Sequence, residues 1–171
     1  MPYKGVTFNN LRQSLYYIYY GASYDPSEAF KYIIPMQNNF FNPIEIDSFN
    51  TYIQYFIEED EPLTQDTAGY NTNYTHKVAH CMLRFVGKDA EEWAKMFHHL
   101  TKQAEVAKIF AQVCQAQRLE YVSSILPVNI DFSGKNSLIA FDVDFKLQYV
   151  ESIDLSFEPL ARVSLASGSV Q

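Results

Sequence analysis

Two carboxylates, Asp142 and Asp144, lie two residues apart in a stretch where apolar and polar residues alternate. On a β-strand their side chains would leave one face about 6.5–7 Å apart, close enough to approach one metal ion or to act as a general acid–base pair. Such a site needs further ligands and shelter from water. The other residues on that face, Ala140, Lys146 and Gln148, include no histidine. We therefore interpret the two aspartates as the solvated side of a strand.

The four histidines do not form a metal-binding pattern either. His76 and His80 are four residues apart in a predicted strand, which would place them on one face but roughly 13 Å apart. His98 and His99 are adjacent in a predicted helix, so their side chains point in different directions. The sequence has no HExxH, CxxC or GxSxG motif and no glycine-rich phosphate loop. We predict no catalytic residue, no cofactor and no metal ligand, and expect a protein that is not an enzyme.

The two cysteines, Cys81 and Cys114, each stand among apolar neighbours and lack any metal-site spacing. Free cysteine is among the most buried residue types and behaves there as a small hydrophobe. We predict two buried free thiols rather than a disulfide or a nucleophile.

Composition limits the class of protein further. The chain has 171 residues, 47% of them hydrophobic, which suits one domain with its own core. Its 13 tyrosines favour half-buried surfaces and interfaces, because each ring is apolar with a polar tip. The net charge of −7, without a stripe of Lys or Arg, argues against a protein that grips nucleic acid by its phosphates. A protein that meets DNA without holding it could be acidic.

Hydropathy indicates neither a membrane span nor a signal peptide. No apolar run approaches the roughly 18 residues that a transmembrane helix needs. The first residues, MPYKGVTFNNLRQS, lack the apolar segment of a secretory signal.

The periodicity of apolar residues predicts the order helix, strands, helix pair, strands. The helices are expected at residues 9–20, 89–100 and 106–114. The strands are expected at residues 30–34, 50–58, 75–86, 118–129, 137–150 and 153–157. Turns and loops are expected at residues 24–28, 58–62, 63–74 and 133–136, and the stretch 63–74 is expected to be long and exposed.

Local signals predict where several of these elements begin and end. Asn9 or Asn10 can cap the first helix, and Gly21 can end it. Asp89, with a glutamate three residues later, predicts a capping box at the second helix. Pro127 interrupts its strand, so an edge or a bulge is expected there.

Strands grouped around a central pair of helices predict an α+β fold. We expect an antiparallel sheet with a helical hairpin packed on one face and an N-terminal helix, in a single domain covering residues 1–171. Residues 165–171 are expected to form a disordered tail. Alternation assigns two sets of residues to the covered face of the sheet: Ala79, Cys81, Leu83 and Phe85, and Ile139, Phe141, Val143, Phe145, Leu147 and Tyr149.

Residues 76–158 resemble the neck and tail terminator proteins of tailed bacteriophages. The likeness starts with a strand that leads through Gly87-Lys88-Asp89-Ala90-Glu91 into a helix. It continues with a later strand running from Asp142-Val143-Asp144-Phe145 to Tyr149-Val150-Glu151. The order of the elements extends it to about residues 10–165. The loops at residues 38–50 and 60–75 do not match.

The resemblance implies a structural virion protein. Such a protein forms a ring, usually a homohexamer, that caps the tail tube and joins it to the head connector while DNA passes through the lumen without tight binding. Its place would be the neck or tail of the virion, and the host cytoplasm during assembly. It would have no catalytic residue.

Two alternatives remain open. The chain could be a head-completion or stopper protein, or a tail-tube protein, of the same particle. It could instead be a small-ligand-binding α+β domain in which the sheet and helices enclose an aromatic pocket.

Overall fold

One long strand organises the sheet in this computed structural model, which describes residues 6–21, 23–36, 51–58, 61–62, 72–132 and 136–154. This strand, β7 (Asn136–Asp154), is 19 residues long. On one side it pairs antiparallel with β4 (Thr72–Val86). On the other side it pairs antiparallel with β5 (Ala116–Val122) and β6 (Leu126–Phe132), which follow each other along it.

The remaining strands extend the sheet beyond β4. β2 (Tyr52–Ile57) pairs antiparallel with one part of β4, and the short β3 (Glu61–Pro62) pairs with another. β1 (Ile33–Pro35) lies at the edge and is parallel to β2. The described sheet therefore has seven strands and is antiparallel except for that one pair. This confirms the predicted α+β class.

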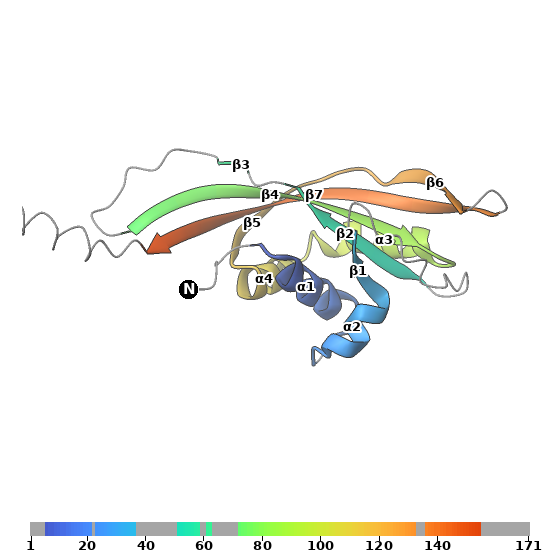
Figure 1. The fold of residues 1–171 in the computed structure, drawn as a ribbon, viewed down its shortest axis with the longest axis horizontal. Coiled ribbons are helices and arrows are strands. Elements are labelled where there is room, and N and C mark those ends of the chain that lie inside the picture. The colour runs from blue at the N-terminus through green and yellow to red at the C-terminus, as the bar shows by residue number, and fades with distance from the viewer. Residues whose placement is uncertain are drawn as a thin grey trace, which may run out of the picture.

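Four helices lie on one face of the sheet (Figure 1). They are α1 (Phe8–Tyr20), α2 (Pro26–Tyr32), α3 (Ala90–Leu100) and α4 (Ala104–Val113). Phe145 of β7 lies at their centre, with its ring 5.3 Å from that of Phe97 in α3 and 5.7 Å from that of Phe110 in α4. The alternating residues of β4 are buried in the same core: Ala79, Cys81, Leu83 and Phe85.

The predicted helical hairpin is not confirmed as a packed pair. α3 and α4 are consecutive and are joined by the turn at residues 101–103. α3, however, packs on β4 and β7, whereas the helix beside α4 is α1. The Sγ atom of Cys114 lies 3.2 Å from the Oγ atom of Ser14, which ties the end of α4 to α1. Each helix thus buries its apolar stripe against the sheet or α1 rather than against its neighbour in sequence.

The predicted end of α1 is confirmed, but its predicted start is not. Gly21 ends the helix as expected: it has a φ of 67°, and its N–H donates to the carbonyl of Tyr17. The prediction that Asn9 or Asn10 is the cap was wrong, because Thr7 accepts a hydrogen bond from the backbone N–H of Asn10 at 3.1 Å. The helix therefore begins one residue earlier than its apolar spacing indicated.

The strand predicted at residues 30–34 is mostly helix. Asp25 caps α2 by accepting a hydrogen bond from the N–H of Ser27, and Pro26 occupies the first helical turn, where its missing N–H costs nothing. The helix then continues through Tyr32, which leaves only Ile33 to Pro35 for the strand. The Asp-Pro signal marked a helix start and not a turn.

Two other local predictions were also inexact. Asp89 is the N-cap residue of α3, but its side chain makes no capping bond; its N–H donates instead to Oγ1 of Thr51. The strand predicted over residues 118–129 is divided at residues 123–125 into β5 and β6, and β5 shows register shifts. Pro127 lies within β6, which is an edge strand of the described sheet, as the proline predicted.

Several predictions concern residues outside the described part of the chain. These are most of the loops at residues 38–50 and 60–75, most of the turn at residues 133–136, residues 155–157 of the predicted last strand and the tail at 165–171. The prediction that a separate strand begins at residue 153 was wrong, because residues 153 and 154 are the end of β7.

Replacing Phe145 by alanine should lower the free energy of unfolding by about 3–5 kcal/mol, because the side chain is fully buried between two helices. Ile139 lies on the same strand but is 57% exposed, so Ile139→Ala should change stability by at most about 0.5 kcal/mol. Urea denaturation of both variants measures the difference. Equal effects of the two substitutions would contradict the described core.

Candidate functional site

The aspartate that sequence analysis placed in solvent is held in an ion pair. Asp142 on β7 is the register partner of Arg84 on β4. The Nε and Nη2 atoms of Arg84 donate to the two carboxylate oxygens of Asp142, both at 2.8 Å. Only 13% of the Asp142 side chain is exposed, and the hydrogen bonds that Arg84 donates to it raise the pKa of Arg84 above its ordinary value. The interpretation of Asp142 as solvated was therefore wrong: it is half-buried and paired.

Asp144 is exposed, as predicted, and does not share the arginine. Its backbone is fixed to the break between β5 and β6, since Ser123 donates to its carbonyl and Ser123 Oγ accepts from its N–H. Partial desolvation raises the pKa of its carboxyl, and the negative charges of Asp142 and Glu58 raise it further. The two aspartates thus differ in partner and environment and do not act as one catalytic pair.

A hollow of about 250 Å³ opens beside Asp144 on the face of the sheet opposite the four helices. Glu58, His80, Met82 and Lys146 also line it. Charges of both signs therefore face the same small space. No group of three or more metal-ligating side chains occurs within the described residues. Of the histidines, His80 is among the described residues that line the hollow.

Both cysteines are buried free thiols, as predicted. Burial raises the pKa of the Cys114 thiol to about 11, and the contact with Ser14 offsets this only in part. A thiol that stays protonated at neutral pH and out of contact with solvent serves packing and not chemistry.

Aromatic rings form a continuous network on the helical side. Tyr19 stacks on Trp93 with ring centroids 4.9 Å apart, and its hydroxyl donates to the carbonyl of Trp93. Tyr20 contacts Trp93 edge-on at 6.0 Å and lies 5.1 Å from Tyr16, which in turn contacts Tyr24 at 5.5 Å. Burial raises the pKa of Tyr20 to about 12, although 40% of the residue is exposed. The network therefore has one edge in the core and one at the surface.

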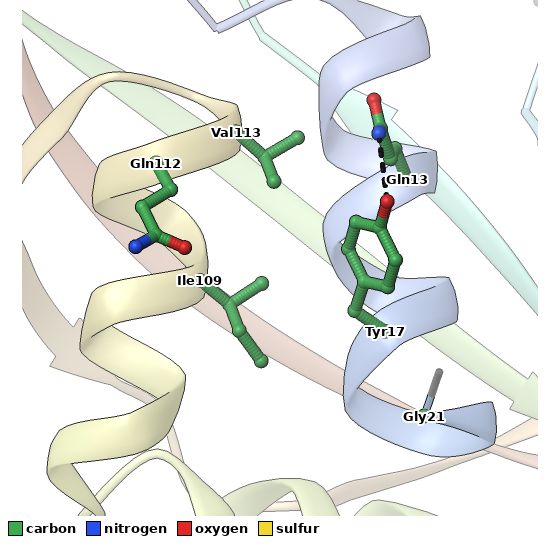
Figure 2. A pocket seen from close by; sticks show the side chains of 6 residues that line it. All are labelled: Gln13, Tyr17, Gly21, Ile109, Gln112 and Val113. Carbon is green, nitrogen blue, oxygen red and sulfur yellow. Dashed lines mark hydrogen bonds between the residues drawn. The ribbon is translucent and has the colours of Figure 1, made fainter. Parts of the chain in front are cut away.

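A groove of about 450 Å³ runs between α1 and α4 (Figure 2). Ile109 and Val113 point from α4 toward α1, and Gln112 lies on the α4 rim. On the α1 side, the amide of Gln13 donates to the hydroxyl of Tyr17 at 3.2 Å. None of the groove's described lining residues is charged, so the groove is suited to binding and lacks the groups for acid–base chemistry.

The lack of charge continues along α1. Its 13 residues include one charged side chain, Arg12, which is buried and hydrogen-bonded to Asn9 and Tyr24. A helix at the surface of a soluble domain normally carries charges on its outer face. The sequence of residues 9–20 already shows this scarcity of charge and is rich in tyrosine, which indicates a helix packed on more than one side. Nothing in that sequence identifies α4 as the helix that lies beside it.

No protein-family model matches the chain, and no curated protein is significantly similar to it. None of the helices that the structure describes is long and apolar enough to cross a membrane.

The ion pair between Arg84 and Asp142 should show a coupling free energy of about 1–3 kcal/mol in a double-mutant cycle with Arg84→Met and Asp142→Asn. The pair is bidentate and largely shielded from water. The matched control is the pair of Arg118 and Glu120, which is 3.8 Å apart with Arg118 72% exposed. That cycle should give at most about 0.5 kcal/mol. Equal couplings for the two pairs would contradict a structural role for the first.

Asp144→Asn should stabilise the protein slightly at pH 7, by up to about 0.5 kcal/mol. A carboxyl whose pKa is raised by folding is less costly in its protonated form, so it weakens the folded state when ionised and ceases to do so as the pH falls. The advantage of the asparagine variant should therefore shrink between pH 7 and pH 3.5. Urea midpoints at both pH values test this, and an advantage that grows toward acid would refute the assignment.

Proposed function

We propose that the chain is a structural virion subunit that assembles head-to-tail into a ring, as a neck or tail terminator protein of a tailed bacteriophage. The observation that carries the proposal is the length of β7, whose two ends lie where the described sheet is only two strands wide. The described fold has the α+β order of elements that the resemblance implies.

Each end of β7 is half of a two-stranded ribbon. Within the described strands, residues 136–140 pair only with β6, and residues 150–154 pair only with β4. Figure 1 shows both ends reaching beyond the helices. A two-stranded ribbon is marginally stable in water by itself, so it gains stability when another surface covers it. In a ring, the neighbouring copies supply that surface.

The ribbon formed by β6 and β7 also exposes apolar side chains. Ile139 is 57% exposed on the face of the core residues, and Leu126 is 52% exposed on the opposite face. Ile139 lies in the two-stranded part, and Leu126 lies at the start of β6, opposite Asp142. Exposed apolar side chains on this ribbon favour contact with a second copy through a different surface of that copy. Such heterologous contacts close into rings when the rotation between subunits permits.

The aromatic network offers a candidate for the complementary surface. Tyrosine and tryptophan are enriched in the cores of protein interfaces, where their rings bury large areas with little loss of side-chain entropy. Tyr16, Tyr20, Tyr24 and Trp93 gather such area on the helical side.

The net charge of −7 is consistent with a lumen through which DNA passes without tight binding, because acidic walls repel phosphates. In this proposal the partners are sister copies in a homohexamer, the tail-tube protein on one side and the head connector or stopper on the other. The protein acts in the neck of the virion and assembles in the host cytoplasm.

Light scattering coupled to size-exclusion chromatography should detect a homo-oligomer, and negative-stain class averages should show a closed ring. Ile139→Asp places a charge at the ribbon without touching the core, so it should reduce the oligomer to monomers that still unfold cooperatively. Ala107→Glu, at an exposed position of α4, is the control and should leave the ring intact. A wild-type chain that stays monomeric at every concentration, alone and with tail-tube protein, would overturn the proposal.

A further inference from the structure

We propose that the groove between α1 and α4 receives the two-stranded ribbon of β6 and β7 from a second copy of the chain, with Ile139 of that copy packed against Ile109 and Val113. The contact would join neighbours in the ring, so it rests on the proposed function and names the two surfaces that meet.

Ile139 lies where the cover of the helices ends. Phe141 is partly buried against the main core, whereas Ile139, two residues earlier on the same face of β7, is 57% exposed. Of the large apolar residues that the structure describes, Ile139 is the most exposed. Its register partner on β6 is Asn129, which is also exposed, so both side chains leave the same face about 5 Å apart. The ribbon therefore presents an aliphatic side chain beside a carboxamide.

The groove presents the matching groups. Ile109 and Val113 point from α4 toward α1, and the carboxamide of Gln112 lies beside them on the rim (Figure 2). Ile139 would lose its contact with water against the two aliphatic side chains. A carboxamide both donates and accepts hydrogen bonds, so that of Asn129 can pair with that of Gln112. None of these side chains carries a charge, so the contact desolvates none.

One chain cannot place its own Ile139 in its own groove. Ala116, three residues after Val113, pairs with Tyr149 of β7, so the α4 side of the groove lies near that point of the sheet. Ile139 is ten residues away from Tyr149 on β7, and ten residues of strand span about 33 Å. Figure 1 shows the same separation, with β6 at one end of the molecule and α4 toward the other. The contact therefore joins two copies through different surfaces, as a closed ring requires.

The surroundings of the groove can enlarge this contact. A stable interface buries roughly 800 Å² on each partner, which is more than one isoleucine covers. The aromatic network adjoins the groove, because the ring of Tyr17 lies 6.1 Å from that of Tyr24. The same neighbouring copy can therefore cover both the groove and the exposed edge of the network, with Ile139 as the central anchor.

Disulfide trapping between full-length chains tests the contact. One population carries Asn129→Cys and a second, with a different affinity tag, carries Gln112→Cys; both positions are exposed, and the native thiols are buried. Disulfides between the two populations should form about tenfold faster than with Ala111→Cys in the second population, because docking raises the effective concentration of the thiols. Ala111 is the matched control, since it is exposed on the same helix and is not among the described residues that line the groove.

A second substitution in the Asn129→Cys chain shows whether Ile139 anchors the contact. Adding Ile139→Ala should remove the rate advantage, whereas adding Ile139→Leu should keep most of it. Because the side chain is exposed within the subunit, both variants should keep the urea midpoint of the parent chain.

The outcomes separate this contact from the proposed function. Equal trapping rates for Gln112→Cys and Ala111→Cys, or disulfides that form mainly between two Asn129→Cys chains, would overturn the contact. A ring in negative-stain images together with equal trapping rates would leave the proposed function standing. Chains that stay monomeric at every concentration and show no preference in trapping would overturn both.

Discussion

The fold depends on a strand, β7, whose two faces have different chemistry. One face carries Val143, Phe145, Leu147 and Tyr149, which are buried beneath the helices. The other carries Asp142, Asp144 and Lys146, of which Asp142 is fixed by Arg84. Because strand side chains alternate with a period of two, a register shift of one residue would bury these charges and expose the core. The pairing of β4 with β7 is therefore strongly specified, and the helices follow from it.

The bidentate ion pair between Arg84 and Asp142 makes the register of β4 and β7 more specific, on the face of the sheet opposite the helices. Arg84 and Asp142 meet directly across the two longest strands, and a register shift of one residue would move their side chains to opposite faces of the sheet and separate them. Next to the pair, alternation places Tyr52, Val86 and Ala140 in a second, smaller apolar cluster on that same face. The face opposite the helices is thus not uniformly solvated. It is polar around the ion pair and apolar where β2, β4, β6 and β7 bring this cluster together.

The sequence predicted the core of this arrangement well, because both long strands alternate strictly and α3 and α4 keep a clear apolar stripe. It failed where a local signal has two meanings. Asp25-Pro26 starts either a turn or a helix, and only the packing of Ala29 and Ile33 against the core decides between them. The pairing of Arg84 with Asp142 could not be predicted either, since strand register is a tertiary property. The same holds for the groove, whose walls are almost 100 residues apart in sequence.

The strand that organises the fold also extends beyond the part of the sheet that is three or more strands wide. A 19-residue strand exceeds the usual five or six residues by far more than a single core requires, and the helices cover only its middle. An isolated domain gains little from projecting ribbons, whose edges invite pairing with other chains. An assembling subunit gains a contact that lies outside its own core, so residues such as Ile139 can serve a neighbour without weakening the fold. The contrast between a buried centre and ends that are only two strands wide supports the proposal that β7 serves assembly.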